Sequence, residues 1–135
     1  MPHVILEQSA NLPQPADHTA LFAELHAALQ RIGGIRLGNC KSRLRVAERY
    51  YIGDGREGLA FAHLDVTFLA GRSEAVKHDI GTACLAILCR HYGVDCAADR
   101  ADEAADEHLQ ITVRIGDIDP ALYAKHPPGT LGGGR

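Results

Sequence analysis

The sequence predicts an α+β fold made of two tandem βαβ units, which form a four-stranded mixed sheet with two helices on one face. The 135-residue chain repeats one order of elements. A strand, a connection, an amphipathic helix and a glycine stop occur over His3–Gly33 and again over Ala60–Gly93, and each half continues into a further strand. Each half is therefore predicted to be a βαβ unit with parallel strands and a right-handed crossover.

The first half starts with a short apolar run that predicts a strand from His3 to about Ser9. Asp17 is a suitable N-cap for a helix over His18–Ile32, whose apolar residues recur at helical spacing. Gly33-Gly34 ends that helix. Alternating apolar residues and arginines then predict a strand over Ser42–Ile52.

The second half repeats this order. Strict alternation over Ala60–Leu69 predicts a half-buried strand. Ser73 is expected to cap a helix that reaches about Tyr92, and Gly93 closes it. The acidic segment Asp95–Glu107 is predicted to be a solvated connector, and alternation predicts a last strand over Leu109–Ile115.

The chain is predicted to form one domain over residues 1–126, with halves at about 2–58 and 59–126. Residues 127–135, which are rich in glycine, are expected to be a mobile tail. The sheet face without helices is expected to be only partly polar, so oligomerisation is the natural way to cover it. This physical argument does not give the number of subunits.

Composition and charge exclude several classes of partner. Hydrophobic residues make up 46% and charged residues 23%, and the net charge of −3 gives no electrostatic reason to expect nucleic acid or an anionic membrane. No apolar run approaches the roughly 20 residues that span a bilayer. The four cysteines form no CxxC pair, which favours reduced thiols over disulfides or zinc. No signal-peptide pattern precedes the first strand, so a cytoplasmic location is expected.

Pro2 is the first candidate for chemistry. Removal of Met1 would expose a secondary amine, which is a base that needs no side chain. An α-amino group titrates at about 8, and burial or nearby cations lower the pKa toward neutrality. A neutral base near working pH is suited to abstracting a proton beside a carbonyl. Many chains begin with Met-Pro, so this pair alone is a weak signal.

Other catalytic and binding patterns are missing from the sequence. His3, His63 and His108 lie on different predicted strands, and no pair of histidines has metal-binding spacing. There is no nucleophile elbow around a serine and no glycine-rich phosphate loop. We therefore expect neither a metal nor a cofactor.

A series of short motifs occurs in the order and spacing of a known family. They are Pro2-His3, Glu7, Ser9, Asn11, Leu21-Phe22-Ala23, Ser42-Arg43, Asp54-Gly55, Ala60-Phe61 with His63, and Ala70-Gly71-Arg72-Ser73. On these motifs the chain resembles the tautomerase superfamily, and within it most closely the 5-carboxymethyl-2-hydroxymuconate isomerases of homoprotocatechuate breakdown. The resemblance is collinear from residue 2 to about 92. After that, only the strand pattern from Leu109 agrees.

The resemblance implies a homotrimer with one Pro2 pocket per subunit and a small-molecule polycarboxylate as substrate. It implies that Pro2, as general base, helps convert a dienol into its conjugated keto isomer without a cofactor. The family arginine that binds a carboxylate matches Arg72, for which the alternative is a solvated loop arginine. A second family arginine is replaced by Lys41, which keeps the charge but lacks the planar fork.

Two further residues match the family at the site. Arg43 matches a family arginine and is a candidate second cation, whereas Arg45 could equally be strand surface. Tyr50 takes the position of a large aromatic residue near the reacting proline, and filling of the core is an equal alternative for it.

Two rival functions remain open at this point. Another proline-dependent tautomerase, a decarboxylase or a dehalogenase could use the same fold, although the last two need a protonated Pro2. A non-catalytic trimeric binding protein is the rival from a different class.

Overall fold

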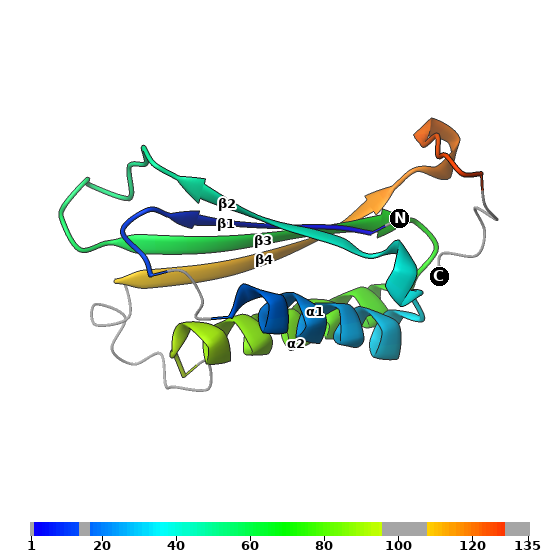
Figure 1. Ribbon diagram of the computed structural model, residues 1–135, viewed down its shortest axis with the longest axis horizontal. Coiled ribbons are helices and arrows are strands. Elements are labelled where there is room, and N and C mark those ends of the chain that lie inside the picture. Colours follow the sequence, from blue (N-terminus) through cyan, green and yellow to red (C-terminus); the bar gives the residue numbers. More distant parts are fainter. Residues whose placement is uncertain (1, 14–16, 96–107, 129–135) are drawn as a thin grey trace.

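The computed structural model describes residues 2–13, 17–95 and 108–128 (Figure 1). The chain forms a four-stranded mixed sheet with two helices on one face, which confirms the predicted α+β class. The elements follow in the order β1 (His3–Ser9), α1 (His18–Gly33), β2 (Lys41–Ala47), β3 (Ala60–Leu69), α2 (Glu74–Tyr92) and β4 (Leu109–Ile118). Two short 3₁₀ helices, η1 (Leu37–Asn39) and η2 (Pro120–Leu122), precede β2 and follow β4.

The strand order β2-β1-β3-β4 places the first strands of the two halves side by side. β1 runs parallel to β2, and β3 runs parallel to β4, as expected for two βαβ units. The two units meet through antiparallel pairing of β1 with β3, in which Val4 lies opposite Val66 and His3 opposite Thr67. This pairing brings the start of the chain to the C-terminal end of β3.

The helix ends form where the sequence places capping residues. The Asp17 carboxylate accepts a hydrogen bond from the Ala20 amide at 3.0 Å, and the Ser73 hydroxyl accepts one from the Val76 amide at 3.2 Å. Gly34 and Gly93 end α1 and α2 in the left-handed conformation, with φ of 66° and 73°. A residue with a Cβ rarely adopts this conformation, so the glycines stop both helices.

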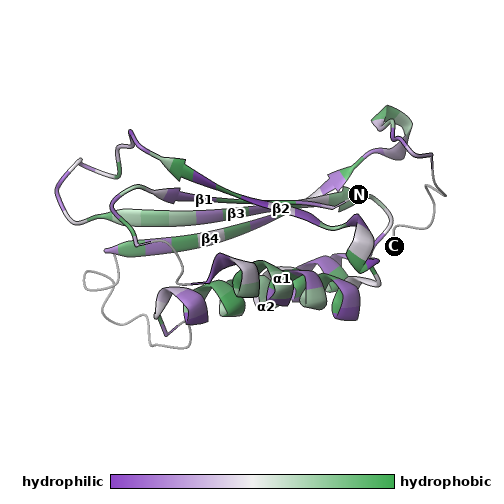
Figure 2. Cartoon of the chain, in the orientation of Figure 1, coloured by the Kyte–Doolittle hydropathy of each residue, from purple (hydrophilic) through white to green (hydrophobic). Residues whose placement is uncertain are grey.

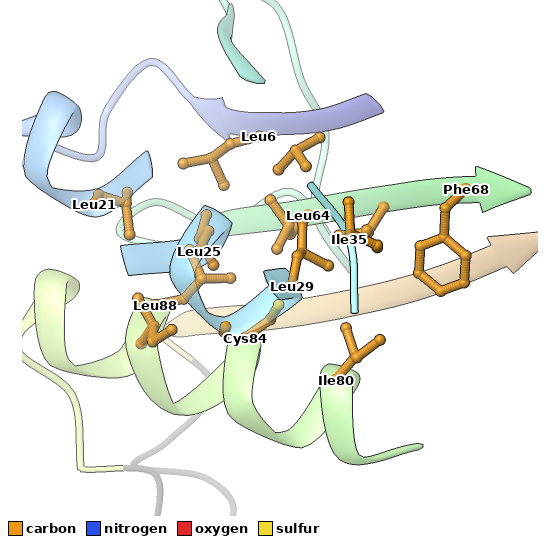
Figure 3. Close-up of a cluster of buried hydrophobic side chains, with 14 of the residues drawn as sticks. Leu6, Leu21, Leu25, Leu29, Ile35, Leu64, Phe68, Ile80, Cys84 and Leu88 are labelled. Carbon is orange, nitrogen blue, oxygen red and sulfur yellow. The ribbon is translucent and has the colours of Figure 1, made fainter. Parts of the chain in front are cut away.

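The core lies between the sheet and the two helices (Figures 2 and 3). Its fully buried side chains come from β1, β3 and one stripe of each helix: Val4, Leu6, Leu21, Leu25, Leu29, Leu64, Val66, Ile80, Cys84 and Leu88. Each aliphatic side chain of this kind contributes about 1.5–3 kcal/mol by leaving water. The predicted stripe of α2 is thereby confirmed at Ile80, Cys84 and Leu88.

The second predicted strand was too long. We expected it to span Ser42–Ile52, but β2 ends at Ala47. β2 is an edge strand, and its neighbour β1 ends at Ser9, which pairs with Ala47. Beyond that point the described residues provide no strand beside β2, so the alternating pattern of the sequence continues without a hydrogen-bonded ladder. Tyr50 consequently lies in the loop before β3. β4 also reaches Ile118, three residues beyond the expected end at Ile115.

The sheet face away from the helices is more polar than the sequence suggested. Alternation places the following side chains on it: Lys41, Arg43, Arg45, His3, Ile5, Glu7, Phe61, His63, Asp65, Thr67, Gln110, Thr112 and Arg114. Arg114 and Asp65 form an ion pair at 3.1 Å across β3 and β4. Ile5 and Phe61 are the large apolar residues of this set. A partner on this face would therefore meet mainly polar and charged side chains.

Three further predictions have different outcomes. Cys40 and Cys84 carry free thiols, but Cys89 is disulfide-bonded, so the expectation of reduced cysteines was wrong there. Neither helix of the described ranges is long and apolar enough to cross a membrane. The acidic connector from residue 96 to 107 and the end of the tail, residues 129–135, lie outside the described residues.

Candidate active site

Pro2 is buried at the start of β1. Its carbonyl oxygen accepts a hydrogen bond from the Lys41 amide at 3.1 Å, so the parallel ladder between β1 and β2 begins at Pro2. Side chains alternate along a strand, and Val4 and Leu6 point into the core. The Pro2 ring is therefore directed to the same, helix-covered face.

Phe68 connects Pro2 to Arg72. Continuing the antiparallel register by one residue beyond His3 and Thr67 places Phe68 opposite Pro2, and both belong to the helix-covered face. The guanidinium carbon of Arg72 lies 5.1 Å from the centre of the Phe68 ring. A cation above a ring face is attracted by the ring quadrupole. One chain thus brings Pro2 and Arg72 to the same end of the sheet.

Arg72 is held by backbone oxygens and is not a solvated loop arginine. Its Nε donates to the Gly33 carbonyl at 2.8 Å, and its Nη1 lies 3.4 Å from the Leu69 carbonyl. Gly33 is the last residue of α1, so the cation sits at the partially negative end of that helix. These contacts fix the direction of the guanidinium. The half-buried side chain is placed immediately before Ser73, the N-cap of α2.

Lys41 and Arg43 approach the start of β1 from the other side of the sheet. Lys41 pairs with His3, and its Nζ donates to the Asn39 carbonyl at 2.9 Å. Arg43 places its Nη1 3.3 Å from the His3 Nδ1. Both side chains are exposed on the open face. The structure therefore does not place them beside Arg72, although both lie close to the first residues of β1.

The start of β1 lies in a positive electrostatic environment. The pKa of His3 is lowered by burial and, in decreasing order, by Arg43, the N-terminal ammonium and Lys41. Burial raises the pKa of the Cys40 thiol, while the same N-terminal ammonium and Lys41 act in the opposite direction. The side-chain cations that act on these two neighbours are Arg43 and Lys41, so positive charge lies close to the first residues of β1.

Tyr50 belongs to the loop between β2 and β3, which lies at the opposite end of the sheet from the N-terminus (Figure 1). Its ring packs edge-on against Phe61 at 6.4 Å between centroids, and the Phe61 amide donates to the Ser9 hydroxyl at the end of β1. The seven residues of β1 span about 20 Å. Tyr50 is also 38% exposed, so it does not fill the core. Within one chain, Tyr50 is therefore distant from both Pro2 and Arg72.

Two hollows of ligand size lie away from Pro2. One, of about 610 Å³, is lined by residues around Tyr50, including Asn11, Arg49 and Arg56. The other, of about 490 Å³, runs between α2 and β4. Neither is lined by Pro2 or Arg72. In the described part of the chain, no three histidine, cysteine or acidic side chains gather as a metal site would require.

Sequence reasoning missed two residues of the Pro2 end. Phe68 is part of the strand predicted over Ala60–Leu69, and Gly33 is predicted only as part of the helix stop. Their contacts with Arg72 depend on how β3 and α1 meet in space, which no local pattern reports. The sequence did contain one signal, because the aromatic residue Phe68 closely precedes Arg72 in the chain.

Comparison with known proteins gives consistent results. The family model of 5-carboxymethyl-2-hydroxymuconate isomerase matches residues 2–128. The 5-carboxymethyl-2-hydroxymuconate Delta-isomerase of Escherichia coli is 29% identical over 125 residues, which cover 93% of each chain. A crystal structure of a 5-carboxymethyl-2-hydroxymuconate isomerase from Deinococcus radiodurans R1 is 31% identical, with a TM-score of 0.73, and covers 92% of this chain and 87% of that one. A fused 4-OT wild-type symmetric trimer, 19% identical with a TM-score of 0.69 and 97% coverage of both chains, shares the fold.

Proposed function

This chain belongs to the 5-carboxymethyl-2-hydroxymuconate isomerase family and is an isomerase, and from that membership we propose that Pro2 is its general base. The substrate is 5-carboxymethyl-2-hydroxymuconate or a similar unsaturated 2-hydroxy polycarboxylate, in the degradation of aromatic compounds. The observation that carries this proposal is the β1–β3 register, which, continued by one residue beyond His3 and Thr67, sets Pro2 opposite Phe68, whose ring lies under the Arg72 guanidinium.

The reaction needs a base that is neutral near pH 7. After removal of Met1, the Pro2 nitrogen takes the proton from the enol oxygen and returns it to a carbon further along the conjugated chain. The conjugation spreads the negative charge over the intermediate dienolate, so the substrate itself supplies the electron sink. Arg43 and Lys41, the two side-chain cations that lower the pKa of His3, act on the adjacent Pro2 amine in the same direction. That environment favours a base over the protonated acid that a decarboxylase or dehalogenase requires.

Arg72 binds a substrate carboxylate and stabilises negative charge near the reacting centre. Its guanidinium is fixed in direction by Gly33 and Phe68, which suits a planar, two-point grip on a carboxylate. Lys41 supplies a point charge at the start of β2, and its single ammonium orients a carboxylate less strictly. Arg43, whose Nη1 lies against the His3 ring, contributes mainly through its charge.

Tyr50 reaches a Pro2 site only if another copy supplies it. We infer a homotrimer in which the loop after β2 of one subunit faces the Pro2 end of the next. Tyr50 and its neighbour Tyr51, which are 38% and 78% exposed, are large side chains left uncovered on that loop. The fused 4-OT symmetric trimer with the same fold supports this assembly. Each subunit would be a single domain over residues 1–126, and a cytoplasmic location stays a prediction.

The experiment compares two forms of the untagged protein in a UV assay with a panel of hydroxymuconates. In one form, mass spectrometry confirms that Pro2 is the N-terminus; in the other, Met1 is retained. The retained peptide bond turns the Pro2 nitrogen into an amide with no basicity, so we expect the rate to fall about 10²–10⁴-fold. The bond from Lys41 to the Pro2 carbonyl is unaffected, so the unfolding midpoint should not change.

A protein that is fully active with Met1 in place would contradict the proposal. Pro2→Ala is the matched variant. It should lower kcat by orders of magnitude while the oligomer remains intact. If no hydroxymuconate reacts but the protein binds the compounds, a non-catalytic binding protein is the better description. If short halogenated or decarboxylating acids react instead, Pro2 acts as an acid.

A further inference from the structure

We propose that Gly33, at the C-terminal end of α1, is a positioning residue for Arg72. Its carbonyl oxygen sets the direction of the guanidinium, and its missing side chain leaves room for the guanidinium and for Ile80 beside the helix end. The inference rests on the proposed carboxylate-binding role of Arg72, and it adds a residue from a different element to that site.

The carbonyl of Gly33 is well suited to hold a cation. The last carbonyl groups of a helix have no partner within the helix and carry partial negative charge. The end of α1 is fixed in place, because Gly34 adopts the left-handed conformation and its amide bonds back to the Gln30 carbonyl at 3.1 Å. Arg72 Nε donates to the Gly33 carbonyl at 2.8 Å, which is shorter than the 3.4 Å from its Nη1 to the Leu69 carbonyl. Figure 1 shows this end of α1 at the same end of the molecule as the N-terminus.

The backbone conformation of Gly33 does not explain why a glycine is present. Its φ is not positive, and it belongs to the regular helix, where alanine is more favourable. The space around it does explain the glycine. A Cβ on Gly33 would lie 3.4 Å from Arg72 Nε and 3.1 Å from the Cδ1 of Ile80. At 3.1 Å the Cδ1 of Ile80 would have to shift, and at 3.4 Å the added methyl group would lie in contact with Nε and restrict how closely the guanidinium approaches the end of α1.

The direction of the guanidinium matters for the reaction because Arg72 lies on the same aromatic ring that Pro2 faces across the strand pair. Gly33, Leu69 and Phe68 together contact Arg72 from three directions. A guanidinium displaced at Nε would present its Nη groups at a different angle and carry the bound carboxylate with it. Misplacement of a substrate by about 1 Å can cost on the order of 100-fold in rate.

The test is Gly33→Ala, with Gly81→Ala as the matched control. Gly81 is also helical, and a Cβ there would meet only Ile115 Cγ1, at an ordinary 3.5 Å. We expect Gly33→Ala to lower kcat/KM for the carboxylated substrate roughly tenfold, mainly through KM, since a hydrogen bond that orients a charged group is disturbed. Gly81→Ala should retain wild-type kinetics. An uncharged enol analogue should react equally well with both variants.

A double-mutant cycle separates positioning from a merely structural effect. If Gly33 acts through Arg72, Gly33→Ala should have no further effect on KM once Arg72→Ala is present. An effect that persists in the Arg72→Ala background overturns the inference. Ile80→Val removes the Cδ1 atom, so full recovery of kcat/KM in Gly33→Ala/Ile80→Val would assign the loss to crowding with Ile80 and also overturn it.

The two proposals fail in distinguishable ways. If Arg72→Ala alone leaves kcat/KM unchanged, the proposed role of Arg72 is wrong, and the inference about Gly33 falls with it. If Arg72→Ala lowers kcat/KM for the charged substrate and Gly33→Ala does not, the proposed function stands and the positioning role of Gly33 is refuted.

Discussion

Replacing Arg72 with alanine tests two separate quantities, the stability of the fold and the binding of a charged substrate. The side chain is half-buried, donates to the Gly33 carbonyl at 2.8 Å, lies 3.4 Å from the Leu69 carbonyl, and stacks over Phe68. A hydrogen bond from a charged donor contributes about 1.5–3 kcal/mol, and a cation–π contact at a partly exposed site about 0.5–1 kcal/mol. Because water reaches the site, we take the lower ends and expect Arg72→Ala to reduce the free energy of unfolding by about 2 kcal/mol.

The kinetic effect should be larger and selective. Loss of one charge-assisted contact with a carboxylate costs about 1.5–3 kcal/mol, which corresponds to about 10–150-fold in kcat/KM. Arg72→Lys keeps the charge without the fork and should fall between wild type and Arg72→Ala. The measurements are urea unfolding and steady-state UV kinetics, with a carboxylated hydroxymuconate and an uncharged enol analogue compared on each variant.

Two results would refute this reasoning. If kcat/KM falls equally for the charged and the uncharged substrate, Arg72 only supports the fold. If unfolding is weakened by the expected amount and kcat/KM does not change for either substrate, the contacts with Gly33 and Phe68 are its whole role.

Two more predictions concern residues at the two ends of the sheet. In the first, Pro2→Ala chains are refolded together with Tyr50→Ala chains at equal ratio. If Tyr50 serves the Pro2 of another copy, random trimers contain sites with both residues intact, and up to about a quarter of wild-type activity should return. No recovery above the parent variants would contradict the trimeric site. Arg43→Gln removes a cation that lowers the pKa of His3, so that pKa should rise toward 6.5 in an NMR titration. The Pro2 amine should respond in the same direction and move the acid limb of kcat/KM to higher pH, and an unchanged limb would show that Arg43 does not influence the base.

The local features of the fold could be predicted from the sequence. Asp17 and Ser73 cap the two helices as expected, because an N-cap depends on one side chain and an amide three residues away. The glycine stops and the alternation of β3 are equally local. These features fixed the order of elements and the two βαβ units, and with them the fold class.

The features that depend on a distant partner could not be predicted in the same way. β2 ends at Ala47 because its neighbour β1 ends at Ser9. The alternation of apolar and polar residues in the sequence, in contrast, continues to Ile52. The disulfide of Cys89 likewise depends on chain proximity and not on a spacing motif. A strand pattern predicts which face a residue occupies, but the neighbouring strand decides where the ladder stops.

The candidate site stays a prediction, and the structure shows how its residues are arranged within one chain. The family resemblance indicated Pro2, Arg72, Lys41, Arg43 and Tyr50 as one group. The structure places Pro2 and Arg72 at one end of the sheet, the cations of β2 on the opposite face, and Tyr50 about 20 Å away along β1. A motif reports which residues a family shares and does not report which copy of the chain supplies each one.

The topology also bears on the pKa of the Pro2 amine that the proposed function requires. β1 pairs antiparallel with β3, and α1 runs back along the sheet. One end of the molecule therefore holds the start of the chain, the end of α1 and the link from β3 to α2 (Figure 1). The end of α1 carries partial negative charge, which by itself would stabilise a protonated amine nearby and raise its pKa. Arg72 sits on that end through the Gly33 carbonyl and offsets its charge. Arg72→Ala should therefore move the acid limb of kcat/KM to higher pH, in the same direction as Arg43→Gln, even for a substrate without a carboxylate to bind.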